Sequence, residues 1–113
     1  MESILTSIKK LLGIAEEYEH FDIDIIIHIN TAFSVLTQLG VGPSSGYSIN
    51  DKHAVWNEFI PAEDKRFNSV KTYVYLKTRL VFDPPQNTAL FEAMERTAKE
   101  LEWRLNVSAE EGS

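Results

Sequence analysis

The amino-acid sequence predicts an all-α fold, a small bundle of four to five helices in a single domain over residues 1–107. Two observations support this fold class. Apolar residues recur at steps of three and four along most of the chain, which is the period of a helix face. Glycine and proline, five and four in number, fall mainly where those patterns stop. The length of 113 residues is enough for one hydrophobic core and too small for two.

The clearest pattern is an α-hairpin with arms at about 66–83 and 87–106. In the first arm, Val74 and Val81 belong to one edge of a broad apolar face, so protein should cover most of its girth. An Asp-Pro-Pro sequence ends this arm, because the residue before a proline is pushed out of the α region and proline cannot donate an amide. Asn87 is a good N-cap for the second arm.

Two further helical patterns precede the hairpin. Residues 2–12 form an amphipathic helix ended by Gly13; it is too short to be stable alone, so its apolar face should dock on the core or on a neighbouring subunit. Residues 22–39 repeat apolar side chains by threes and fours up to Gly40. Their isoleucine-rich start would also suit a strand, but the length and the sustained spacing favour a helix. We expect this helix to pack across the hairpin, which should form the hydrophobic centre.

Residues 41–50 are a loop rich in glycine, proline and serine. The glycines do not match a phosphate-binding loop, because no Lys-Ser or Lys-Thr pair follows them and no strand precedes them. Residues 51–59 then predict a short helix that presents Trp56. A tryptophan at such a position belongs either to the core or to a contact surface. Trp56 and Tyr47, which lies in the loop, are therefore two candidate interface residues.

The C-terminal end offers the other candidate interface residues. Trp103 lies off the apolar stripe of the 87–106 helix, where it either closes the edge of the core or belongs to a contact surface. Asn106 and Val107 follow it as further candidates. Residues 108–113 are expected to form a flexible acidic tail.

The residue types indicate no catalytic, metal-binding or cofactor-binding site. The chain has no cysteine, which excludes a disulfide framework, a cysteine-ligated zinc site and a thiol nucleophile. Asp24 and His28 are four residues apart, but no second histidine pair completes a metal site. Ser45, Asp51 and His53 lack the strand and turn that position a catalytic serine. We therefore predict that the protein is not an enzyme and needs no cofactor.

The charge is acidic and unevenly placed. The net charge is −6, and residues 1–60 carry three lysines against eight acidic residues. Sequence-specific DNA recognition requires a basic stripe that this chain lacks, whereas an acidic wall lets DNA pass without sticking. No segment approaches about 18 consecutive apolar residues and no signal peptide is evident. No membrane partner is expected, and a cytoplasmic protein is the default expectation.

Five stretches follow one another along the chain in a characteristic order: LLGI at 11–14, FDIDIIIHIN at 21–30, QLGVGP at 38–43, VKTYVYLKTRLVFDPP at 70–85 and ELEWRLN at 100–106. In this order the sequence resembles the small head–tail connector proteins, also called head completion or adaptor proteins, of tailed bacteriophages and prophages. The resemblance covers nearly the whole chain and is weakest over 44–69. Its signatures are structural and not catalytic.

The resemblance implies an all-helical subunit that assembles into a ring, commonly a dodecamer, beneath the portal protein. Such a ring extends the DNA channel and offers a platform to the tail or stopper protein at the head–tail interface of the virion, after synthesis in the bacterial cytoplasm. We expect the free protein to be a monomer that forms its ring on the portal. The residues leave a second interpretation open, a small acidic helical module that binds a host or phage protein without catalysis.

Overall fold

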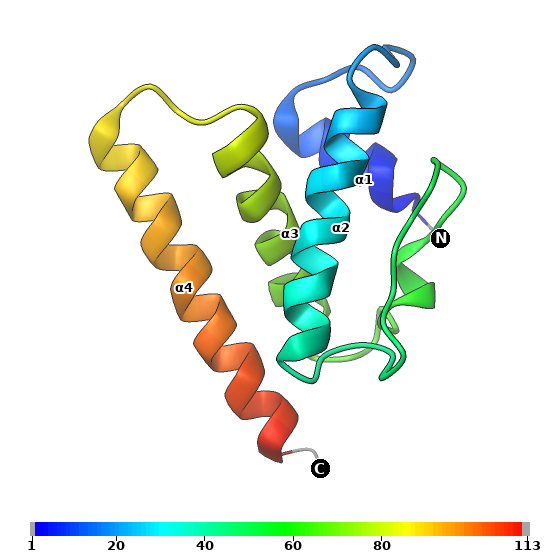
Figure 1. Cartoon of the computed structure of the whole chain (residues 1–113), viewed down its shortest axis with the longest axis vertical. Coiled ribbons are helices and arrows are strands. Elements are labelled where there is room, and N and C mark those ends of the chain that lie inside the picture. The colour runs from blue at the N-terminus through cyan, green and yellow to red at the C-terminus, as the bar shows by residue number, and fades with distance from the viewer. Residues whose placement is uncertain (1, 112–113) are drawn as a thin grey trace.

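The computed structural model describes residues 2–111 and consists of helices joined by loops (Figure 1). The helices are α1 (Ile4–Leu12), α2 (Asp22–Gln38), the single-turn 3₁₀ helix η1 (Trp56–Glu58), α3 (Phe67–Phe82) and α4 (Thr88–Glu111). Over residues 2–111 there is no β-strand, and Ser3 and Val55 form an isolated antiparallel bridge. The predicted all-α class is confirmed.

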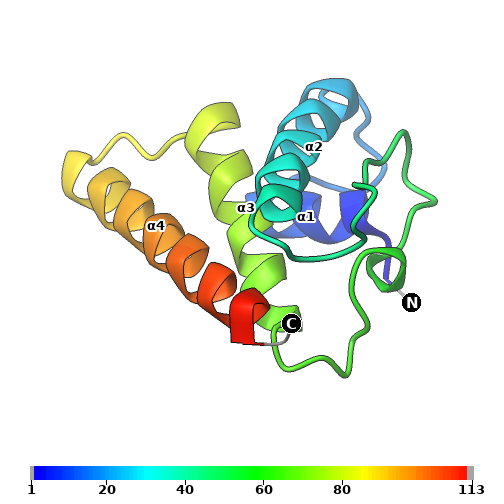
Figure 2. The ribbon, with the colours of Figure 1, turned by 60° about the horizontal axis from the view of Figure 1, so that its bottom comes forward.

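Helix α3 is the centre of the molecule. Figure 2 shows it between α4 on one side and α1 and α2 on the other. Val70, Tyr73 and Val74 of α3 are fully buried. The buried residues of α2 are Ile25, Ile29, Ala32, Phe33 and Leu36. Helix α2 therefore packs across α3 with the stripe that its spacing predicts.

The second arm of the hairpin contributes less to the core than expected. Of the residues of α4, Ala98 and Leu105 are the two that are buried, and Figure 1 shows the start of α4 standing away from α3. Val81, predicted to lie on a covered face, is 64% exposed in the last turn of α3. The hydrophobic centre is therefore α3, which packs against α2 and α4 as predicted, although α4 buries fewer side chains than a central arm of the hairpin would.

Gly13 and Asn87 stand at helix ends as predicted, and Ser3, which was not predicted as a cap, caps the start of α1. The Ser3 side chain accepts a hydrogen bond from the Thr6 amide (3.2 Å), and Gly13 ends α1 in the left-handed region at a φ of 80°. The Asn87 Oδ1 accepts a hydrogen bond from the Leu90 amide (3.0 Å) at the start of α4. Each contact satisfies a helix-end amide or carbonyl that has no partner within its helix.

The short helix predicted at 51–59 is wrong except for the single turn η1. The Asp51 Oδ1 accepts a hydrogen bond from the His53 amide (2.8 Å), which favours a turn over a helix. The Ala54 carbonyl then accepts from the Ile4 amide (3.0 Å), and Val55 is extended. This segment is therefore shaped by its contact with the start of α1, a tertiary interaction that its own sequence does not reveal.

The last helix is longer than predicted. Helix α4 continues past the expected end at Asn106 to Glu111. Ala109 packs against the core cluster and lies close to Gly40, so this end of the helix gains buried contacts. Residues 108–111 of the expected tail are thus helical, and residues 112 and 113 lie outside the described part of the chain.

The 41–50 loop is held tightly against the core. The Asn30 side chain donates to the Ile49 carbonyl (2.9 Å) and accepts from the Ile49 amide (2.8 Å). Val41 and Ile49 are buried, and Gly42 has a φ of 86° with its α-carbon against the Phe59 ring. The loop therefore forms part of the wall of the domain.

Candidate interaction surfaces

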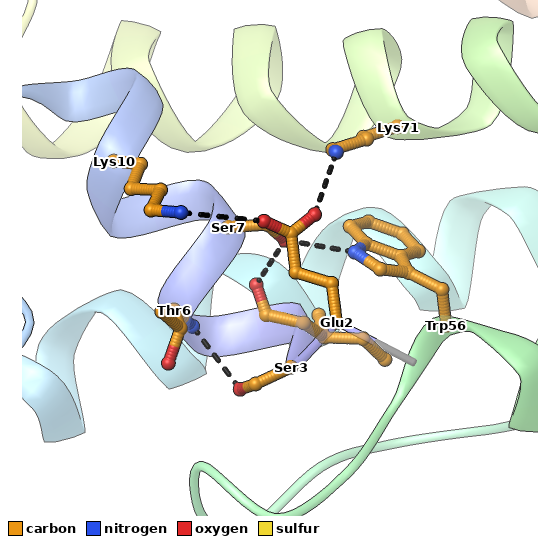
Figure 3. A network of polar contacts seen from close by, with 8 residues as sticks. Glu2, Ser3, Thr6, Ser7, Lys10, Trp56 and Lys71 are labelled. Atoms are coloured by element: carbon orange, nitrogen blue, oxygen red, sulfur yellow. Dashed lines mark hydrogen bonds and ion pairs between the residues drawn. The ribbon is translucent and has the colours of Figure 1, made fainter.

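Trp56 is a core residue in this subunit. Its indole is fully buried, and its Nε1 donates to the Ser7 Oγ (2.8 Å), as Figure 3 shows. In the same network Glu2 accepts from the Lys71 Nζ (3.0 Å) and joins the start of α1 to α3. Of its two possible roles, the structure gives Trp56 the one in the core, so its ring is not presented to a partner.

Tyr47 is half-buried beside the same core. Its ring meets Phe33 edge-on, with centroids 5.1 Å apart, and its hydroxyl donates to the Glu58 Oε1 (2.7 Å). Burial raises the pKa of the Tyr47 hydroxyl above its usual value, and the Glu58 carboxylate raises it further. Tyr47 offers one edge to solvent, and its hydroxyl is already committed within the subunit.

The three C-terminal candidates lie together near the end of α4. The Trp103 side chain is 67% exposed. Asn106 and Val107 are half-buried, and the Asn106 Nδ2 donates to the Leu39 carbonyl (3.4 Å). Among the five candidate interface residues, Trp103 therefore presents the most side chain to solvent.

Two cations share the exposed face of α4 with this tryptophan. Arg96, Lys99 and Trp103 are spaced by three and four, which places them on one side of the helix. Within residues 2–111, no ion pair or side-chain hydrogen bond engages Arg96 or Lys99, whereas the nearby Arg104 pairs with Glu100 at 3.3 Å. We call Arg96, Lys99 and Trp103 the tryptophan surface; it combines an exposed aromatic ring with two cations, and Glu92, Glu95 and Glu100 lie one turn away on the same helix.

A second exposed surface lies beside the start of α2. A hollow of about 270 Å³ is lined there by Leu5, Glu19, Asp22, Ile23, Ile26, Asn50, Asp51, Lys52 and His53. The floor is apolar, and Ile23 is 76% exposed at its edge. We call this region the isoleucine hollow. Sequence analysis missed this hollow; the position of Ile23 outside the buried stripe of α2 was an available signal, but the contribution of residues 50–53 was not predictable.

A buried lysine holds the loop that borders this hollow. The Lys9 side chain is 2% exposed, and its Nζ donates to the carbonyls of Glu16 (2.9 Å) and Tyr18 (2.7 Å). The same Nζ lies 2.8 Å from the Asp22 Oδ1, an ion pair without hydrogen-bond geometry. The three oxygens surround the ammonium and compensate for its burial. Sequence analysis missed this role because lysine side chains on helices normally reach water.

Aromatic rings gather on the other side of the same loop. Tyr18 and His20 both contact Phe21, which meets Phe82 of α3 edge-on with centroids 5.4 Å apart. The His28 ring also lies near the Phe82 ring, with centroids 6.5 Å apart. His20 and His28 thus pack with aromatic neighbours. Across residues 2–111 no group of three or more histidine, aspartate or glutamate side chains could hold a metal ion.

A larger hollow of about 770 Å³ lies where the end of α4 approaches the 64–66 turn. Its lining is mainly polar, with Asp64, Lys65 and Arg66 on one side and Ser108 and Glu111 on the other. The guanidinium of Arg66 binds the Asp64 carboxylate through two hydrogen bonds (3.1 and 3.0 Å). This contact holds the pKa of the Asp64 carboxyl below its usual value. The hollow lacks the apolar floor typical of a ligand site.

The structure is an all-α subunit with apolar side chains, such as Trp103 and Ile23, exposed on different helices. The phage connector protein family matches residues 4–112. The chain therefore belongs to this family, a structural and non-enzymatic class of bacteriophage proteins. No curated protein and no solved structure matches the chain. No helix within residues 2–111 is long and apolar enough to cross a membrane.

Proposed function

We propose that the protein forms a homo-oligomeric ring between the portal and the tail or stopper protein, joins head to tail and extends the DNA channel. The observation that carries this proposal is the family match, which spans nearly the whole chain. Exposed side chains on two different elements, Trp103 on α4 and Ile23 on α2, support it, because an assembly subunit needs surfaces for several neighbours.

The charge supports passage of DNA without binding to it. The net charge is −6, and residues 16–24 carry five acidic residues with no lysine or arginine among them. Acidic groups repel the phosphates of DNA, whereas the basic patches of DNA-binding proteins attract them. A ring built from such subunits can surround DNA without holding it.

The experiment that tests this function uses DNA-filled heads that lack a tail and carry the portal. The purified protein should co-sediment with these heads and be absent from pellets of heads without portal, and native mass measurement should give one ring per portal. Phage deprived of the protein should accumulate full heads that cannot bind tails. Absence of binding to the portal, together with stoichiometric capture of another phage or host protein, would support the second interpretation.

A further inference from the structure

We infer that the subunits of the ring join head to tail, with the tryptophan surface of one copy seated in the isoleucine hollow of the next. This inference rests on the proposed ring. A closed ring needs two different, complementary surfaces on each subunit. In Figures 1 and 2, α4 lies along one edge of the molecule, and the start of α2 with the 50–53 segment lies toward the opposite edge. Surfaces on opposite edges can join successive copies.

The charges of the two surfaces are complementary. Arg96 and Lys99 lie two turns and one turn before Trp103 on α4, and within residues 2–111 neither forms an ion pair or a side-chain hydrogen bond. The hollow carries Glu19, Asp22 and Asp51 against one cation, Lys52. Lys9 neutralises Asp22 from below, and the residues 16–24 that border the hollow are otherwise acidic. A second copy therefore supplies the cations that this surface lacks.

The apolar parts also match in kind and size. Tryptophan is among the residues that dominate binding energy when they are buried at an interface, and Trp103 is exposed in the free subunit. The hollow offers Leu5, Ile23 and Ile26 as an apolar floor. Its volume of about 270 Å³ leaves room for one large side chain.

Both walls of the hollow are fixed before any partner arrives. Lys9 holds the chain at Glu16, Tyr18 and Asp22. On the other side, the two hydrogen bonds between Asn30 and Ile49 anchor the segment that leads into residues 50–53. A preformed hollow lowers the entropic cost of docking. This cost matters for a subunit that contributes one small contact to each neighbour.

The test uses the absence of cysteine in the chain. One variant carries Asn50→Cys on the hollow and Lys99→Cys on the tryptophan surface, and a short bis-maleimide reagent joins nearby thiols. The reagent is applied to concentrated free protein and to protein bound to portal-bearing heads. We expect a ladder of covalent oligomers in at least the head-bound sample. The matched control replaces Asn50→Cys by Asn68→Cys, an exposed position on α3, and should give no ladder.

Charge exchange provides the second arm of the test. Arg96→Glu with Lys99→Glu should reduce formation of cross-linked or head-bound rings at least about tenfold, because like charges then face each other. Adding Glu19→Lys and Asn50→Lys, two positions that line the hollow, to the same chain should restore it. If the wild-type chain binds to heads but the double-cysteine variant gives no ladder in either sample, or if charge exchange gives no rescue, this contact is overturned and the connector function still stands. Failure of the wild-type chain to bind portal-bearing heads would instead reject both.

Discussion

At the scale of single residues, a few polar groups are placed where their removal should strongly lower the stability of the domain. Lys9 is the clearest case, since one ammonium binds three oxygens of the 16–22 segment while almost wholly buried. Its neighbour Lys10 is mostly exposed, and the Lys10 Nζ lies 3.8 Å from the Glu2 Oε2. Removal of Lys9 should therefore destabilise the domain more than removal of Lys10, because Lys9 is buried and Lys10 is exposed.

Lys9→Ala should lower the free energy of unfolding by about 3 kcal/mol, because it leaves the Asp22 carboxylate and two loop carbonyls without their partner. Lys10→Ala is the matched control and should stay within about 0.5 kcal/mol of the parent. Urea unfolding followed by circular dichroism measures both. Equal stability of the two variants would show that Lys9 does not hold the loop.

Two glycines allow backbone strain to be separated from crowding. Gly42 and Gly46 both have positive φ, at 86° and 94°. A β-carbon at Gly42 would overlap the Phe59 ring, whereas at Gly46 nothing lies within 4 Å. Gly46→Ala should cost about 1–2 kcal/mol from the left-handed backbone, and Gly42→Ala about 1–3 kcal/mol more from overpacking. Thermal unfolding of the two variants tests this order, and identical losses would contradict the crowding at Phe59.

At the scale of elements, a buried tyrosine joins α3 to α4. The Tyr73 hydroxyl donates to the Glu102 Oε2 (2.7 Å), and the Lys77 Nζ lies 3.9 Å from the same oxygen. Burial raises the pKa of the Tyr73 hydroxyl above its usual value, and the Glu102 carboxylate raises it further. Since few side chains of α4 are buried, this bond is a main attachment of the outer helix.

Tyr73→Phe should lower stability by about 2 kcal/mol at neutral pH, the usual contribution of a hydrogen bond to a charged group. The native pKa is raised, so the contribution is complete below the unfolded pKa of about 10 and is lost as pH rises above it. The parent should therefore lose stability above pH 10 more steeply than the variant. Urea titrations between neutral and alkaline pH measure the difference, and parallel curves would argue against the Tyr73–Glu102 bond.

Two valines of α3, Val74 and Val81, provide a further matched pair. Val74 is fully buried, and Val81, two turns later on the same face, is 64% exposed. Val74→Asp should abolish cooperative thermal unfolding, because an unpaired buried charge costs several kcal/mol. Val81→Asp should change the free energy of unfolding by less than about 1 kcal/mol. A sharp transition in Val74→Asp near that of the parent would show that the core is elsewhere.

At the scale of the whole molecule, hydrophobic period and helix-end residues predicted the helices well, because each helix buries a stripe against α3. The starts and ends that failed depend on distant contacts. Residues 51–55 are extended or turned because the Ile4 amide bonds to Ala54, and α4 reaches Glu111 because Ala109 finds the core. Neither contact can be read from local sequence.

The surfaces were predicted less completely than the fold. Trp103 was a candidate because it falls off the apolar stripe of its helix; its side chain is exposed and does not close the edge of the core, and its part in an interface stays a prediction. The isoleucine hollow was missed, since it combines the start of α2 with residues 50–53 from another part of the chain. Period in a sequence reveals which side of a helix is buried, but it does not reveal which exposed segments meet.

The Asn30 side chain hydrogen-bonds the backbone of the loop at Ile49, as neighbouring backbone groups do within helices and strands. The Ile49 amide donates to a side-chain oxygen at 2.8 Å and the residue is buried, so its proton is shielded from solvent on both counts. In hydrogen exchange this amide should be as slow as those in the middle of α2, and should be released only when the domain opens as a whole. Asn30→Ala should make it exchange on the time scale of a surface loop. The least regular part of the chain would then report on global unfolding.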